Sequence, residues 1–124
     1  PKDPEALKKL LADTNGGVPA VVDFVGSEAS LKFAMGSVRK GGQVVIVGLF
    51  GGGFSMPIPL FPMRAISIGG SYVGSLGETH EMMELVKAGK IDPIPVEERP
   101  LDAASKSLDD LRKGGVMGRV VLKP

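Results

Sequence analysis

The sequence predicts an α/β fold built on a parallel sheet, and three features of the chain carry this prediction. Short apolar runs rich in β-branched residues occupy residues 20–25, 43–47 and 65–68, which suits buried strands. The segment between the first two runs has the apolar spacing of a helix, and glycine follows each run. Strands that alternate with helices form parallel sheets, because each crossover helix covers one face of the sheet.

The central strand is expected at residues 43–47, between Gly42 and Gly48. Every residue after Gln43 in this run is β-branched and apolar, whereas a half-exposed strand would alternate apolar with polar residues. The strand should therefore be buried on both faces.

Two helices are expected in the first third of the chain. Asp3 should cap the first, with Pro4 at its first helical position, and residues 15–17 should end it. Its apolar stripe consists of Leu7, Leu10 and Leu11. Ser27 should cap the second helix, which is expected to end in the basic turn and glycines of residues 39–42. Its buried side consists of Leu31, Ala34, Met35 and Val38.

The middle of the chain is rich in proline. Prolines within residues 57–62 predict an extended loop or an edge strand for residues 54–62, because proline interrupts helices and donates no hydrogen bond to a sheet. A third helix is expected over residues 78–87, with Ser75 and Glu78 forming a capping box. Its apolar side consists of Met82, Leu85 and Val86.

The last third of the chain has a different character. Residues 93–96 should be extended, and Asp102 should cap a fourth helix that turns Leu108 and Leu111 inward and ends at residues 113–115. The run at residues 118–122 is predicted to form a final strand.

Composition excludes several classes of function. A net charge of +1, with five Phe and one Tyr, gives neither the basic field nor the stacking surface that nucleic-acid binding needs. The absence of cysteine excludes disulfides and thiolate metal ligands. No run is long enough for a membrane span, and the first residues resemble neither a signal peptide nor an anchor. A cytoplasmic protein without membrane partners is therefore expected.

Individual motifs give little sign of catalytic chemistry. Residues 51–53 are three glycines, but prolines rather than a helix follow them, so a flexible turn is favoured over a phosphate loop. His80 is the only histidine and should be solvated in the first turn of a helix. Ser27 and Ser71 have no base to activate them. Asp23, within an apolar strand, should be held by backbone donors, with a catalytic role as the alternative.

The glycine-bearing strand ends are the best candidate for a binding site. Ligands of open parallel sheets bind beyond the carboxyl ends of the strands, and glycine lets a ligand approach the backbone. The strand ends at residues 25–27, 47–49 and 69–71 should therefore share one ligand crevice, although glycine is also an ordinary turn residue.

Four segments together resemble the C-terminal part of the zinc-type medium-chain alcohol dehydrogenases: residues 22–27 (VDFVGS), 40–48 (KGGQVVIVG), 70–74 (GSYVG) and 118–122 (GRVVL). This resemblance implies a partial Rossmann fold, a doubly wound parallel sheet. The chain would supply strands four to six with their covering helices, plus a C-terminal helix and strand. Residues 1–90 would then be the second half of the nucleotide-binding domain, and residues 91–124 a tail that belongs to the catalytic domain.

The resemblance also implies a set of cofactor contacts for NAD or NADP. The matching residues are Phe24 and Val25 beside the adenosine, with Gly26 next to them; Val47, Gly48 and Leu49 around the nicotinamide and its ribose; Ser71 and Val73 at the carboxamide; and Arg119 at the pyrophosphate. An arginine suits the last position because its planar guanidinium pairs with phosphate through two donors.

The family's other functional parts find no match in this sequence. Neither the Gly-x-Gly-x-x-Gly turn nor the zinc ligands are here, so the resemblance implies no catalytic residue and no metal ligand in this chain. The expected function is to hold the nicotinamide side of the cofactor in a parent enzyme that binds zinc and acts on a small alcohol or carbonyl compound. The isolated chain is expected to be inactive.

Two alternatives stay open, a zinc-free quinone reductase relative and a non-enzymatic module for dimerisation or binding. If the chain folds by itself, a homo-oligomer is expected, because an uncovered edge at the strand of residues 20–25 invites association. By resemblance, residues 54–60 are a second place for a dimer contact.

Overall fold

The computed structural model describes residues 4–124, and these divide between Val73 and Gly74 into two compact units. Asp3, the expected cap of the first helix, lies outside the described residues. No helix among residues 4–124 is both long enough and apolar enough to span a membrane.

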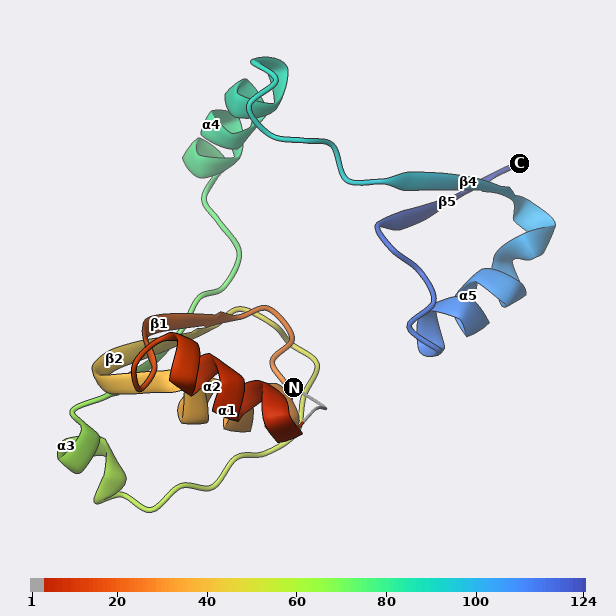
Figure 1. Ribbon diagram of the computed structural model, residues 1–124. Coiled ribbons are helices and arrows are strands. Elements are labelled where there is room, and N and C mark those ends of the chain that lie inside the picture. The colour runs from red at the N-terminus through yellow and green to blue at the C-terminus, as the bar shows by residue number, and fades with distance from the viewer. Residues whose placement is uncertain (1–3) are drawn as a thin grey trace. The chain divides into compact units, whose positions relative to one another are not determined.

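The first unit is a three-stranded parallel sheet with helices (Figure 1). Its elements are α1 (Pro4–Asp13), β1 (Val18–Asp23), α2 (Glu28–Ser37), β2 (Val38–Ile46), α3 (Leu60–Arg64) and β3 (Ser67–Gly70). The strand order is β1-β2-β3, and both neighbouring pairs are parallel. The predicted α/β class and the central position of β2 are therefore confirmed.

The core of this unit lies between α2 and one face of the sheet. Its buried side chains are Ala34, Met35, Val38, Val44 and Ile66. Val44 of β2 is completely buried, whereas Val45, on the other face, is only partly covered. The expectation that the central strand is buried on both faces is therefore wrong, because in this unit α2 packs on one face only.

Helix α1 packs on α2 at a glycine. A Cβ built on Gly36 would lie 2.8 Å from Cδ2 of Leu7, so a larger residue there would require the Leu7 side chain to shift. As predicted, the Asn-Gly-Gly segment ends α1: Asn15 and Gly16 take positive φ angles, and the Gly16 amide donates to the Leu11 carbonyl at 2.8 Å.

The junction between α2 and β2 differs from the expectation. The basic residues 39–42 do not form the last turn of α2, because Val38 already has extended backbone angles and pairs with Val18 of β1. Gly42 is needed at this junction, since a Cβ there would lie 2.6 Å from the Pro19 carbonyl oxygen. Strand β2 is therefore longer at its start than the apolar run alone predicts.

The proline-rich segment contains a helix that the sequence does not predict. An extended loop or edge strand over residues 54–62 is wrong at its end, where α3 begins at Leu60. Pro59 occupies the N-cap and Pro62 the third helical position. Amides of the first helical turn have no intrahelical acceptor, so proline loses no hydrogen bond there.

Strands β1 and β3 are shifted by two residues from the predicted runs. β1 ends at Asp23, because the Asp23 side chain takes the Val25 and Gly26 amides out of the ladder. β3 begins at Ser67, because Ala65 ends α3 in a left-handed conformation with φ 49°. Ile66, between α3 and β3, is buried in the core.

The second unit contains α4 (Leu76–Lys87), β4 (Val96–Pro100), a 3₁₀ helix η1 (Leu101–Ala103), α5 (Ala104–Arg112) and β5 (Arg119–Lys123). β4 and β5 form a parallel pair, which confirms the final strand. The sequence predicts only extended backbone for residues 93–96 and no strand at residues 96–100, because this stretch lacks an apolar run.

Helix α4 has the predicted capping box but begins at Leu76, two residues before the predicted start, and has no buried side. Ser75 and Glu78 form the expected capping box, with the Ser75 amide 2.6 Å from a Glu78 carboxylate oxygen. The apolar residues Met82, Leu85 and Val86 are each at least 40 % exposed. The expected packing side is wrong for the unit as it stands, since no residue of α4 is buried.

Helix α5 is anchored by polar rather than apolar residues. Asp102 is not its cap, because η1 precedes the helix and Ala103 occupies the N-cap. Leu108 and Leu111 are exposed, contrary to the inward orientation expected for them. The buried residue is Ser107, whose hydroxyl accepts a hydrogen bond from Nη1 of Arg99 on β4 at 3.1 Å.

Candidate functional site

The carboxyl ends of the three parallel strands meet at one edge of the first unit. Ile46, the last residue of β2, pairs with Asp23 of β1 and with Gly70 of β3. The Ser71 amide continues this pairing and donates to the Ile46 carbonyl at 2.9 Å. The glycine-bearing strand ends therefore lie side by side, as the sequence predicts.

Asp23 is the last residue of β1 at this edge and is only 6 % exposed. One carboxylate oxygen, Oδ1, accepts the Val25 amide at 2.9 Å and the Gly26 amide at 3.0 Å. The other oxygen, Oδ2, accepts the Ser30 hydroxyl at 2.8 Å. Burial alone would raise the pKa of Asp23, but the three hydrogen bonds to the ionised carboxylate together lower it. Asp23 is thus held by backbone donors, as expected, with Ser30 as an additional partner.

The loops after β1 and β2 touch through two glycines. A Cβ built on Gly26 would lie 1.9 Å from the Gly48 carbonyl oxygen, and one built on Gly48 would lie 2.1 Å from the Val25 carbonyl carbon. Beyond this contact, the Phe50 amide donates to the Val25 carbonyl at 3.1 Å. Both glycines are therefore required by backbone contact, not only by turn geometry.

A hollow of about 300 Å³ lies beside these loops. It is lined by Asp23, Gly26, Ser27, Glu28, Leu31, Ile46, Gly48, Leu49, Gly51, Gly52, Gly53 and Phe54. Its charged lining residues are acidic, and neither lysine nor arginine is among those that the structure describes around it. The hollow therefore suits an uncharged, partly apolar group better than a phosphate.

Several predicted contact residues are apolar and exposed at this edge. Phe24 is 75 % exposed, Leu49 is 80 % exposed, and Val25 is also exposed. Val73 has a positive φ of 44°, which is unusual for a β-branched side chain and places backbone strain at this position. The exposed apolar side chains of Phe24, Val25 and Leu49 can cover the flat face of an aromatic ring.

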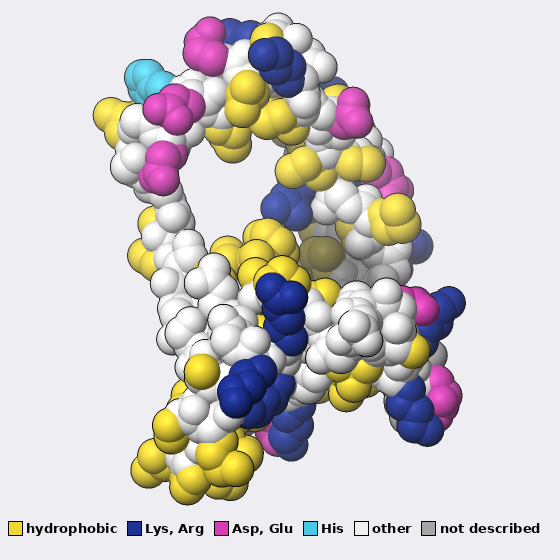
Figure 2. Space-filling view, turned by 60° about the vertical axis from the view of Figure 1, so that its left-hand side comes forward, with side chains coloured by type: hydrophobic (Ala, Val, Ile, Leu, Met, Phe, Trp, Pro, Cys, Tyr) yellow, Lys and Arg dark blue, Asp and Glu magenta, His cyan; other side chains and the backbone are white. Residues whose placement is uncertain are grey.

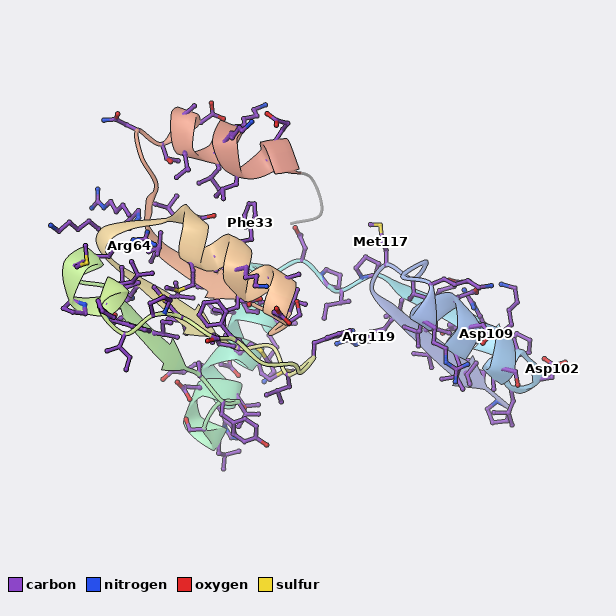
Figure 3. The ribbon with its side chains drawn as sticks, turned by 90° about the horizontal axis from the view of Figure 1, so that it is seen from below. Phe33, Arg64, Asp102, Asp109, Met117 and Arg119 are labelled. Carbon is purple, nitrogen blue, oxygen red and sulfur yellow. The ribbon has the colours of Figure 1, made fainter. Side chains whose placement is uncertain are left out.

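Arg119 is the one predicted contact that belongs to the second unit. It is the first residue of β5 in the second unit (Figure 3). Its side chain is exposed, and Nη1 donates to the Gly118 carbonyl at 3.3 Å. The remaining predicted residues, from Phe24 to Val73, all belong to the first unit.

Sequence reasoning missed two polar residues of the first unit. Ser30 forms a capping box with Ser27 and also binds Asp23, and the Ser-x-x-Ser spacing was the available signal. Arg64 lies against the end of α2 in Figure 3, where Nη1 donates to the Met35 carbonyl at 2.8 Å and Nη2 to the Val38 carbonyl. No sequence pattern pairs these distant residues.

The described residues offer no metal site. No group of three or more His, Cys, Asp or Glu side chains is close enough within residues 4–124 to hold an ion. His80, the single histidine, lies on the surface in cyan in Figure 2, in the solvated position expected for it.

Fold and site together define a class of protein. A parallel sheet with glycine at adjacent carboxyl strand ends is the arrangement of Rossmann-type nucleotide-binding domains. A family model described as zinc-binding dehydrogenase matches residues 1–88. The chain belongs to the zinc-binding dehydrogenase family.

Relatives agree with this family. The chain is 38 % identical to an NAD-dependent alcohol dehydrogenase of Sulfolobus acidocaldarius, over 98 % of this chain and 35 % of the relative. The solved alcohol dehydrogenase of Aeropyrum pernix has a TM-score of 0.87 and 34 % identity, over 98 % of this chain and 35 % of that one. The chain thus spans about a third of the length of the relatives it matches.

A quinone oxidoreductase is also among the similar solved structures. The enzyme of Pseudomonas syringae has a TM-score of 0.73 but only 20 % identity, over 99 % of this chain and 41 % of that one. At that identity the likeness shows the fold alone.

Proposed function

We propose that this chain supplies the nicotinamide side of the cofactor site of an NAD(P)-dependent alcohol dehydrogenase. Such an enzyme is an oxidoreductase that transfers hydride between an alcohol, or the corresponding carbonyl compound, and the cofactor. The observation that carries the proposal is the shared edge of the three strand ends, with Gly26 against Gly48. Membership of the family and the names of the relatives support it.

The residues of this chain would bind and orient the cofactor. When bound, the nicotinamide supplies the carbon that accepts or gives the hydride. Phe24 and Val25 would cover the adenosine. Residues 47–49 would surround the nicotinamide and its ribose, and the exposed Leu49 would exclude water from the ring. The glycines allow the cofactor to approach the backbone, because no Cβ projects there.

Two further contacts belong to this proposal. The backbone of Ser71 and Val73 would bind the carboxamide, with Ser71 acting through its carbonyl because its amide already donates to the Ile46 carbonyl at 2.9 Å. Arg119 would pair with the pyrophosphate through its guanidinium. The exposed Arg119 side chain has no carboxylate partner among the ion pairs of the described residues, so it is available for an anion.

Zinc does not fit the residues of this chain. The described residues contain no cluster of metal-binding side chains, and the sequence has no cysteine. The role proposed for this chain therefore involves no metal ligand. We propose that zinc, the substrate contacts and the hydride-transfer centre lie in other parts of the parent enzyme. The isolated chain would then bind cofactor weakly and turn over no alcohol.

The assignment of residues 1–90 to the nucleotide-binding domain and 91–124 to the catalytic domain is part of the same proposal, as is a cytoplasmic location. NADP is as admissible as NAD, because the residue that selects between them is not in the proposed site. The two compact units divide earlier, after Val73.

Titration of the 124-residue chain with nicotinamide mononucleotide, NAD⁺ and NADP⁺ tests the binding half of the proposal. Amide resonances of residues 47–49 and of Ser71 should shift in NMR spectra, whereas those of α1 should not. Shifts confined to α1, or none at millimolar ligand, would contradict it.

Activity is tested by replacing the corresponding segment of the Sulfolobus acidocaldarius relative with residues 1–124 of this chain. The graft should keep NAD-dependent oxidation of alcohols.

We propose further that the parent enzyme is a homo-oligomer that uses the proline-rich segment. Ile58 is 81 % exposed and Met63 is 68 % exposed, beside prolines 57, 59 and 62. Figure 2 shows hydrophobic side chains gathered over this α3 segment at the bottom of the face in view. In the parent enzyme, Ile58→Asp should lower the apparent mass measured by sedimentation, because a charge in the interface separates the subunits. Ile94→Asp, at an exposed residue of the second unit, should leave this mass unchanged. An unchanged mass for Ile58→Asp would remove this segment from the interface.

A further inference from the structure

Asp23 uses nearly all of its polar atoms to hold neighbouring backbone. Its carboxylate accepts the Val25 and Gly26 amides and the Ser30 hydroxyl. Because Ser30 lies in the first turn of α2, its hydrogen bond to the Asp23 carboxylate ties the end of β1 to the start of the helix. A carboxylate that accepts several donors while buried is strongly oriented.

The backbone of Asp23 holds the other loop. Its carbonyl oxygen accepts the Val47 amide at 2.9 Å and the Gly48 amide at 3.0 Å. One residue therefore binds the loops after both β1 and β2. We call these contacts of Asp23 with Ser30 and with the amides of residues 25, 26, 47 and 48 the Asp23 network.

The two loops cannot move separately within this network. The Gly26 and Gly48 backbones touch so closely that neither position has room for a Cβ. Displacement of the Gly26 amide, which the Asp23 side chain holds, would therefore displace Gly48 as well. Gly48 lies in the segment proposed above to surround the nicotinamide.

We propose that Asp23 is a positioning residue of the cofactor site, fixing the loop at residues 47–49 through Gly26 without touching the cofactor itself. This inference rests on the proposed function. A role in stability alone is the competing explanation, since a buried and fully bonded carboxylate also contributes to folding. The amides of Val47 and Gly48 distinguish the two explanations, because they donate to the Asp23 backbone carbonyl and not to its side chain. If Asp23 positions the second loop, removal of its side chain should speed hydrogen exchange at these two amides.

The test compares four variants of the 124-residue chain. Asp23→Ala removes both carboxylate oxygens, and Asp23→Asn keeps one oxygen to accept the Val25 and Gly26 amides. Ser30→Ala removes a single donor and is the milder variant should Asp23→Ala fail to fold. Ser37→Ala is the matched control, because Ser37 is buried like Asp23 and its hydroxyl donates to the Phe33 carbonyl at the far end of α2.

Two quantities are measured for each variant, the dissociation constant for nicotinamide mononucleotide and the hydrogen-exchange rates of the backbone amides. Asp23→Ala should weaken binding roughly tenfold, the factor that corresponds to one net hydrogen bond, and should speed exchange at Val47 and Gly48. Ser30→Ala should do the same to a smaller degree. Asp23→Asn should restore most of the affinity, and Ser37→Ala should leave both quantities unchanged.

Three results would contradict the inference. Unchanged affinity in Asp23→Ala would overturn it, as would faster exchange confined to residues 25 and 26. An equal loss of affinity in Ser37→Ala would reduce Asp23 to a stabilising residue. If the unchanged chain binds no nucleotide, the proposed function fails, and hydrogen exchange then decides by itself whether the Asp23 side chain fixes the second loop.

Discussion

Gly48 is a residue of the first unit at which the addition of one methyl group should have a large effect on stability. A Cβ there would lie 2.1 Å from the Val25 carbonyl carbon and 2.3 Å from its oxygen, both of them backbone atoms that cannot rotate away. Gly48→Ala should therefore lower the free energy of unfolding by about 1–3 kcal/mol, the usual cost of overpacking. Urea denaturation of the chain measures this change.

Gly53→Ala is the matched control for this substitution. Gly53 belongs to the same loop, but a Cβ there meets no atom within 4 Å. The stability of Gly53→Ala should stay within about 1 kcal/mol of the unchanged chain, with any gain coming from reduced freedom of the unfolded state. Similar losses for both variants would mean that glycine flexibility, not the backbone contact, matters in this loop.

Asp23 should also make stability depend on pH. Its pKa in the folded chain is lowered, so its contribution is fully present above the unfolded value of about 3.9. As the pH falls below that value the unfolded chain binds the proton first, and the contribution is lost as the pH falls through the folded pKa. Urea midpoints measured from pH 7 to pH 2 should therefore fall less steeply for Asp23→Asn. Parallel curves for the two proteins would contradict this.

Among the elements, α2 is held at its end by an arginine from α3. The Arg64 guanidinium donates to the Met35 and Val38 carbonyls, which are left without intrahelical partners at the helix end. Arg64→Met keeps most of the side-chain length but removes both donors, and should cost about 1.5–3 kcal/mol in urea unfolding. Arg112→Met, which breaks only an exposed pair with Asp109, should cost less than about 0.5 kcal/mol.

In the second unit, Arg99 joins β4 to α5. Its guanidinium is mostly buried and bonds Asp110 at 2.9 Å, Ser107 at 3.1 Å and Glu97 at 2.8 Å. These carboxylates raise the pKa of Arg99 further, so it stays charged. Arg99→Met should leave Ser107 and Asp110 poorly bonded and lower the stability of this unit by about 1–3 kcal/mol. Lys123→Met, which breaks the exposed pair between β5 and Glu98, is the control and should be nearly neutral.

For the whole molecule, two compact units predict two largely independent contributions to stability. Arg64 lies in the first unit and Arg99 in the second, and they share no bonding partner. The effects of Arg64→Met and Arg99→Met should therefore add within about 0.5 kcal/mol in the double variant. A larger coupling energy, measured by hydrogen exchange in each unit, would mean that folding of one unit depends on the other.

Much of the fold and the outline of the site follow from the sequence. β-branched runs and the glycines after them locate the strands, and a parallel sheet must bring their carboxyl ends to one edge. The strand limits do not follow, since β1 ends where the Asp23 side chain takes the next amides. No local pattern indicates helix α3 or the buried Ser107, and the Ser-x-x-Ser spacing indicates the capping box of Ser30 but not its bond to Asp23.

The parallel strand pairing described above also bears on how the chain reaches its fold. In the described residues no strand pairs with another through a hairpin: Asp23 meets Ile46, Gln43 meets Ser67, and Val96 meets Arg119. Each pairing must close a long loop, and the entropy cost of closing it comes before any hydrogen bond of the ladder forms. Such non-local contacts slow folding. During synthesis β1 has no strand partner from this unit until β2 has left the ribosome. An unpaired strand edge favours association, so the chain is prone to aggregate during this interval.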